Sequence, residues 1–114
     1  MTFLNIHFME EMKKAIIEGH KDCTSRRIPY GKVGDVFLVF HEGGRIAKCT
    51  LTAITKRTLA DVTSHFYQRE GFPSQADFIR KWCDIHPKRG YIPSDQVWLH
   101  EFSVQFEKKG ENKP

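Results

Sequence analysis

The residues best suited to chemistry lie together in residues 19–26, which read GHKDCTSR. Within this segment Lys21 supplies an amine and Thr24 a hydroxyl. Amide hydrolysis needs a nucleophile, a group that takes its proton and a donor that stabilises the developing charge, so this pair can serve only if the amine is neutral. A lysine that stays charged would instead anchor an anion. The segment therefore predicts either a catalytic site or a binding site.

Glu70 is a third candidate for the same site. It follows Phe66 by four residues and Val62 by eight, so in a continuous helix its carboxylate lies along the apolar stripe. A carboxylate in the last turn of a helix is also disfavoured by the helix dipole. Two explanations remain: Glu70 is buried as the partner of Lys21 or Arg26, or it turns outward to solvent at the helix end.

Two features of the segment bear on the choice between catalysis and binding. In a regular strand Lys21 and Thr24 project to opposite faces, so their cooperation requires a bend or bulge between them. The carboxylate of Asp22 is adjacent to Lys21 and is expected to keep the amine charged, which favours binding.

Other polar and aromatic side chains are candidates for binding phosphate groups or stacking on a base. Arginine presents a planar fork of donors that suits phosphate oxygens and base edges, and aromatic rings stack on splayed bases. We expect Trp98 to pack in the core instead, because it alternates with Phe102 and Val104. The candidates for RNA or nucleoside binding are Arg26, Arg27, Tyr30, Lys32, Tyr67, Lys88 and Arg89.

The cysteines predict neither a disulfide framework nor a metal site. Cys23, Cys49 and Cys83 are odd in number and irregular in spacing, which is typical of a reducing compartment and leads us to expect the cytoplasm. Cys83 and His86 have the spacing of half a zinc site, but no second pair of ligands has a fitting spacing. We expect no metal and no cofactor, and thiols that act as small buried hydrophobes.

The elements that must position these residues are short and of mixed type. Gly19 is placed to end a helix, Ser74 and Asp77 to begin another, and residues 42–44 to form a hairpin turn. Residues 36–40 are five large apolar residues in succession, which predicts a strand buried on both faces. Strands are expected over residues 2–7, 21–26, 36–40, 47–53 and 97–106, and helices over 8–18, 61–70 and 75–84.

The chain as a whole is expected to form one α+β domain. At 114 residues it is too short for two comfortable cores, so residues 1–107 are assigned to a single domain and 108–114 to a polar tail. The formal charge of +4 favours anionic partners weakly. No stretch approaches the roughly 18 apolar residues that a membrane span needs, and the N-terminus lacks the order of a signal peptide.

Three short motifs together resemble ASCH domains of the PUA-like superfamily. They are G-x-K-x-x-T-x-R over residues 19–26, GKVGDV over 31–36 and EGF over 70–72. The resemblance extends from about Met12 to Phe106 and implies a small curled β-barrel with packed helices and a cleft beside the first helix. It also implies RNA binding or RNA-related regulation.

One small bacterial branch of that family hydrolyses N4-acetylcytidine. By motif position its proposed catalytic lysine, threonine and glutamate correspond to Lys21, Thr24 and Glu70, whereas Asp22 stands where that branch often has threonine. We therefore expect an RNA- or modified-nucleoside-binding domain that is a monomer or a weak dimer. The alternative is an amidohydrolase with Thr24 as nucleophile, Lys21 as base and Glu70 orienting the amine.

Overall fold

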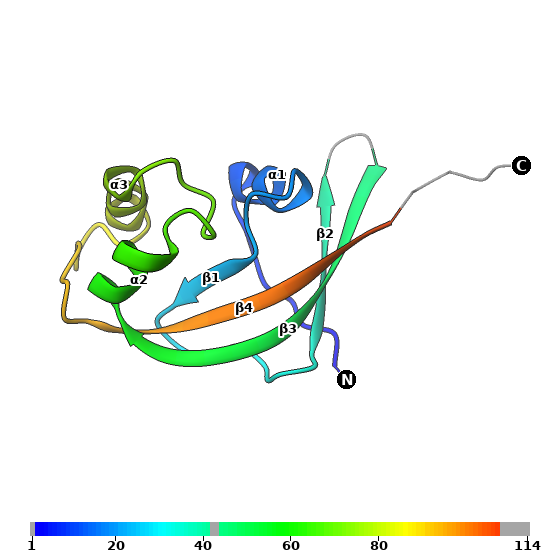
Figure 1. The fold of residues 1–114 in the computed structure, drawn as a ribbon, viewed down its shortest axis with the longest axis horizontal. Helices are drawn as coiled ribbons and strands as arrows, with labels where there is room; N and C mark the ends of the chain where they lie inside the picture. The colour runs from blue at the N-terminus through cyan, green and yellow to red at the C-terminus, as the bar shows by residue number, and fades with distance from the viewer. Residues whose placement is uncertain (1, 42–43, 108–114) are drawn as a thin grey trace, which may run out of the picture.

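The computed structural model describes residues 2–41 and 44–107, which form one antiparallel sheet and three helices (Figure 1). The four strands lie in the order β1-β4-β3-β2. In chain order the elements are α1 (Glu10–Ile17), β1 (Cys23–Arg26), β2 (Val36–His41), β3 (Arg45–Thr58), α2 (Leu59–Phe66), α3 (Gln75–Ile85) and β4 (Gln96–Glu107). Within the described part of the chain, no helix is both long and apolar enough to cross a membrane.

The sheet curls because β3 and β4 are long and bent along their whole paired length (Figure 1). The pairing shifts register at Thr52, since Leu51 lies opposite Phe102 whereas Ala53 lies opposite Glu101. Such a bulge bends a strand and increases its twist. All three helices lie on the concave side. The α+β class with a small curled barrel predicted from the sequence is confirmed, and the four strands form a half-barrel.

The core consists of two apolar clusters on the concave side of the sheet. One packs α1 against β2, β3 and β4, and the other packs α2 and α3 against β1 and β4. The buried members of the first cluster are Ile16, Ile17, Phe37, Val39, Ala47, Cys49, Leu51 and Phe102. Those of the second are Cys23, Leu59, Val62, Phe78, Trp82, Val97 and Leu99.

The predicted helix signals act as expected. Gly19 follows α1 with a φ of 84°, in the left-handed region that favours glycine, and its N–H donates to the carbonyl of Ile16. Ser74 caps α3 by accepting a hydrogen bond of 3.1 Å from the backbone N–H of Asp77. The second helix differs from its prediction because Thr58 caps it, so that it begins at Leu59 rather than residue 61 and ends at Phe66.

The strand predicted over residues 2–7 is wrong. That segment makes only an isolated parallel bridge between Phe3 and Val36, held by backbone hydrogen bonds of Leu4 and Thr2 with Val36. Beyond this bridge the segment pairs with no strand, and Phe8 packs on the ring of Phe37. The strand predicted over 21–26 begins at Cys23, and the one over 47–53 extends from Arg45 to Thr58. The ends of the remaining two strands differ from their predictions by one residue at most.

The prediction that residues 36–40 are buried on both faces is also wrong. Phe37 and Val39 face the core, but Leu38 and Phe40 are 39% and 58% exposed. Strand β2 lies at an edge of the sheet, and the helices cover only the concave face. In the hairpin turn predicted for residues 42–44, Glu42 and Gly43 lie outside the described residues, as does the tail 108–114.

The prediction that Trp98 packs in the core is also wrong, because its side chain lies on the face of the sheet that the helices do not cover. Val97 and Leu99 are buried on β4, whereas Trp98 is half-buried on the opposite face with the amine of Lys56 5.3 Å from its ring. Further along the strand Phe102 is buried, so the inward face changes between these positions, close to the bulge in β3. Period-two reasoning across a bulge assigns one end of the strand to the wrong face.

Substitutions on β2 test this one-sided burial. Phe37→Ala is expected to lower the free energy of unfolding by about 3 to 5 kcal/mol, because it opens a cavity in the core. Phe40→Ala, on the exposed face of the same strand, is expected to change it by less than about 0.5 kcal/mol. Urea unfolding of both variants measures the difference, and equal losses would contradict the arrangement.

Candidate functional site

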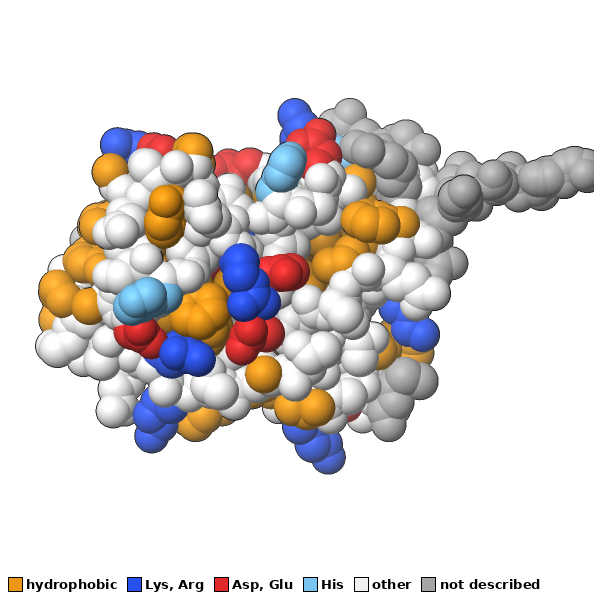
Figure 2. Space-filling view, in the orientation of Figure 1, with side chains coloured by type: hydrophobic (Ala, Val, Ile, Leu, Met, Phe, Trp, Pro, Cys, Tyr) orange, Lys and Arg blue, Asp and Glu red, His pale blue; other side chains and the backbone are white. Residues whose placement is uncertain are grey.

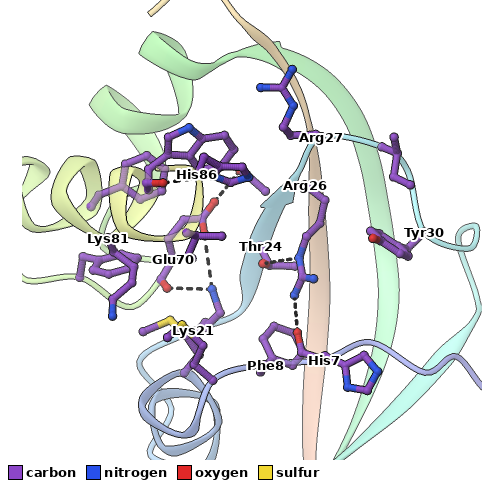
Figure 3. A pocket seen from close by; sticks show the side chains of 18 residues that line it. His7, Phe8, Lys21, Thr24, Arg26, Arg27, Tyr30, Glu70, Lys81 and His86 are labelled. Carbon is purple, nitrogen blue, oxygen red and sulfur yellow. Dashed lines mark hydrogen bonds and ion pairs between the residues drawn. The ribbon is translucent and has the colours of Figure 1, made fainter. Parts of the chain in front are cut away.

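A pocket of about 490 Å³ opens between α1, β1 and α3 (Figure 3). Phe8, Met12, Phe78 and Trp82 are among the apolar residues that line it. Several of its polar groups come from the segment singled out in the sequence and from the segment after α2. Those from the two segments include Lys21, Thr24, Ser25, Arg26 and Glu70, and His7, Lys81 and His86 also line the pocket.

The amine of Lys21 is buried at the floor of this pocket, with 3% of the residue exposed. It donates hydrogen bonds of 2.8 Å to the backbone carbonyl of Cys23 and 2.8 Å to that of Glu70. A third, weaker contact of 3.4 Å reaches Oε1 of Glu70. All three partners are acceptors, so they match the three donors of an ammonium group.

Glu70 is buried to the same extent, so the first of the two explanations left open by the sequence holds, although α2 ends at Phe66 and the continuous helix assumed there is absent. It lies just after α2, where its N–H donates to the carbonyl of Phe66. The next residue, Gly71, has a φ of 102°, and a Cβ there would lie 3.3 Å from that of Ala15 and 3.4 Å from that of Lys21. A glycine at this position therefore lets the chain turn close enough to bring Glu70 against Lys21.

Ser25 is a site residue that sequence reasoning missed. Its hydroxyl donates a hydrogen bond of 2.6 Å to Oε2 of Glu70. The two carboxylate oxygens are thus divided between Ser25 and Lys21. The signal in the sequence was its place two residues after Cys23 in a strand, which puts both residues on the face that packs toward the helices.

Arg26 forms a wall of the pocket (Figure 3). Its guanidinium carbon lies 5.0 Å from the centre of the Phe8 ring and 5.7 Å from that of Tyr30. Its Nη2 donates to the carbonyl of His7 at 2.9 Å, and its Nε to Oγ1 of Thr24 at 3.3 Å. Burial lowers the pKa of Arg26 from its ordinary value, so its charge is held in a partly desolvated place where an anionic or carbonyl oxygen binds strongly.

Lys21 precedes β1, so the strand alternation that would separate it from Thr24 does not apply, and both residues line the pocket. The expected effect of Asp22 is corrected. Its carboxylate accepts from Nε of Arg69 at 2.7 Å, and Arg69 also donates to Glu101 at 2.9 Å. The carboxylate that contacts Lys21 is therefore that of Glu70, not that of its sequence neighbour.

The other predicted binding residues are divided between the pocket and the outside. Arg27 and Tyr30 line the pocket. Arg27 and Arg89 both donate to the carboxylate of Asp95, so part of their charge is already compensated. Four of the candidates lie outside the pocket, namely Lys32, Tyr67, Lys88 and Arg89. Of these, Tyr67 packs against the second core cluster.

The surface charges are mixed rather than concentrated. On the face in Figure 2, basic and acidic side chains lie next to each other. Arg57 pairs with Asp61, for example, and Arg69 with Asp22. Because opposite charges are paired, this face carries no large patch of one sign. Specific recognition of a ligand would therefore depend more on the pocket than on long-range attraction.

The cysteines and histidines give little support to metal or thiol chemistry. Burial raises the pKa of Cys23 and raises that of Cys49 to about 12, so both behave as inert thiols. His86 stacks on Trp82 with ring centres 4.2 Å apart. Among residues 2–41 and 44–107, no three His, Cys, Asp or Glu side chains gather as metal ligands.

Comparisons with known proteins identify the fold. No protein-family model matches the sequence, and no curated protein matches it. The ASCH domain from Lactobacillus crispatus superposes with a TM-score of 0.61 and 14% identity over 93% of this chain and 80% of its own. The ASCH protein from Zymomonas mobilis gives a TM-score of 0.65 and 15% identity over 90% and 67% of the two chains.

A protein from Enterococcus faecalis is also similar, with a TM-score of 0.64 and 14% identity over 99% of this chain and 84% of its own. At these identities the likeness concerns the fold. The chain therefore has the fold of ASCH domains, as the sequence motifs predicted.

The buried contact between Lys21 and Glu70 can be tested by a double-mutant cycle. Lys21→Met or Glu70→Gln alone is expected to lower the free energy of unfolding by about 3 to 5 kcal/mol, because each leaves the charge of its partner uncompensated in the interior, although that partner keeps its other hydrogen bonds. The double variant is expected to lose about 1 to 3 kcal/mol less than the sum. The exposed pair Lys13 and Glu10 is the matched control and should show a coupling below about 1 kcal/mol. Additive losses at the buried pair would contradict this account.

Proposed function

Starting from the ASCH fold, we propose that this protein binds an RNA base or a modified nucleoside in the pocket beside α1. The observation that carries the proposal is the combination of aromatic walls with a buried polar floor in one cavity. Its volume of about 490 Å³ lies within the range of small-ligand sites, roughly 300 to 1,000 Å³. A cavity of this size suits one nucleoside, or one base turned out of a single strand.

The hydrogen-bonding pattern of the floor favours a base that carries an amino group. The proton of the Ser25 hydroxyl is committed to Glu70, so its free lone pairs are acceptors. The Thr24 hydroxyl accepts from Arg26, so its own proton is free to donate. Remaining N–H groups of Arg26 are donors too.

Cytosine has an edge that complements this pattern and is the smaller of the bases that do so. It offers an exocyclic amine, a ring nitrogen and a carbonyl oxygen, which are a donor and two acceptors. Uracil has a carbonyl in place of the amine. Its carbonyl oxygen would lie against Ser25 and Glu70, whose free positions are also acceptors, so no hydrogen bond could form there. The proposed ligand is therefore a cytosine nucleoside or a cytosine within single-stranded RNA.

The contacts of Lys21 favour binding over catalysis by a neutral lysine. All three partners of the amine are acceptors, and an ammonium group with three such partners has no lone pair with which to take a proton. Lys21 is then an anchor that orients Glu70 toward Ser25. This role needs no change of charge during function.

Calorimetric titration with cytidine and uridine tests the binding proposal. Cytidine is expected to bind about 5- to 150-fold more tightly, because the wrong base edge costs about 1 to 3 kcal/mol. Arg26→Ala is expected to weaken cytidine binding about tenfold or more through loss of a charged donor. Arg80→Ala, on the exposed side of α3, is the matched control. Equal affinity for the two nucleosides, or no binding, would overturn the proposal for these ligands.

Amide hydrolysis is the second candidate, favoured by a specific contact. A hydroxyl that donates to a carboxylate oriented by a third group is the arrangement of an activated nucleophile, and Ser25, Glu70 and Lys21 have it. Thr24, the nucleophile expected from the sequence, lines the same pocket but has Arg26 rather than a base as its contact. Either hydroxyl would attack the acyl carbonyl of an N4-acylated cytidine, so that an acyl ester forms while the bond from the acyl carbon to N4 breaks and cytidine leaves with the proton of the hydroxyl. Water would then hydrolyse the ester, release the carboxylic acid and restore the hydroxyl.

A chromatographic assay with N4-acetylcytidine tests this second candidate. If the protein is a hydrolase, it converts the substrate to cytidine, and both Lys21→Ala and Glu70→Ala abolish the conversion. Thr24→Val and Ser25→Ala then identify the nucleophile, since only the variant that removes it should lose all turnover. The absence of conversion by well-folded protein would reject hydrolysis of this substrate.

A further inference from the structure

The imidazole of His100, on β4, is fully buried. Its hydrogen-bond partners determine which ring nitrogen carries a proton. Its Nδ1 lies 3.0 Å from the carbonyl of Trp98 and 3.3 Å from that of Thr24. Its Nε2 accepts a hydrogen bond of 2.9 Å from the backbone N–H of Tyr30. Carbonyls only accept and a backbone amide only donates, so the proton is on Nδ1 and the ring is neutral.

This one bond holds a wall of the pocket in place. Tyr30 belongs to the loop between β1 and β2, and its ring lines the pocket. That ring lies 6.1 Å from the ring of His100 on one side and 5.7 Å from the guanidinium of Arg26 on the other. The position of Tyr30, and through it the packing of Arg26 against Phe8, therefore depends on an acceptor at Nε2 of His100.

We infer that His100 is a positioning residue of the pocket, which fixes the Tyr30 and Arg26 wall while its ring is neutral and releases that wall when Nε2 takes a proton. A proton on Nε2 would face the N–H of Tyr30, so a hydrogen bond would become a contact between two donors. The ligand consequence rests on the proposed function, whereas the release of the loop does not. His100 acts through Tyr30 and Arg26 and need not touch the ligand.

The surroundings of His100 decide the direction of the effect. Arg26 on β1 is the charged group that faces it, the phenol of Tyr30 lies on the loop, and the residue opposite on β3 is the apolar Ile54. Burial, and to a smaller degree the charge of Arg26, lower the pKa of His100 below its ordinary 6.5. The hydrogen bonds to the carbonyls of Thr24 and Trp98 act in the opposite direction but do not outweigh the burial. The unfolded chain therefore takes the proton first, so stability falls as the pH drops below about 6.5.

Hydrogen exchange of the Tyr30 amide tests the inference without any ligand. In the wild-type protein its protection, corrected for the intrinsic rate, is expected to fall at least about tenfold between pH 7.5 and pH 5. In His100→Gln the side-chain oxygen can accept from Tyr30 and has no proton to gain, so protection should stay constant with pH. His65→Gln changes an exposed histidine and should keep the wild-type response. Constant protection in the wild-type protein would overturn the inference. This measurement needs no variant, so it does not depend on whether His100→Gln folds.

Cytidine titrations at the same pH values separate the two proposals. The wild-type affinity is expected to fall about fivefold or more toward pH 5, and His100→Gln should remove most of that dependence. Binding that does not vary with pH in the wild-type protein would overturn the inference and leave the proposed function standing. If cytidine fails to bind at every pH, the proposed function fails for this ligand, and the exchange of the Tyr30 amide still decides whether His100 holds the loop.

Discussion

The site depends on one buried contact, that between the amine of Lys21 and the carboxylate of Glu70. Two charges removed from water cost several kcal/mol each unless every donor and acceptor finds a partner. The backbone carbonyl of Cys23, the hydroxyl of Ser25 and the close turn at Gly71 supply those partners and the room for them. The pair joins the segment before β1 to the segment after α2, and both residues line the pocket.

Much of the fold could be predicted from local patterns. The caps and stops of the helices depend on neighbours within one or two turns, which the sequence contains. The exposure of Phe40 and the outward direction of Trp98 could not be predicted in this way. They depend on which face of the sheet the helices cover and on a bulge in β3, and both are properties of the assembled sheet.

The site shows the same division. Lys21, Thr24 and Arg26 lie close in sequence and line one pocket. Ser25 and His100 were not foreseen as site residues, since their roles follow from a partner 45 residues away and from the pairing of β1 with β4. Arg89, a candidate for RNA or nucleoside binding, instead donates to Asp95 on its own loop. Other surface cations also form ion pairs that a count of charges does not reveal, such as Arg57 with Asp61.

The position of β1 at the edge of the sheet has a consequence for synthesis on the ribosome. Its neighbour in the sheet is β4, which pairs residues 23–26 with residues 98–101. A nascent chain can close the hairpin of β2 and β3 early, but residues 23–26 can pair only after β4 has emerged. Contacts of such long sequence separation form late and slow the folding of a domain. The pocket would therefore be complete only after β4 has paired, so that a chain arrested before β4 has the residues of the motif but no pocket to hold them.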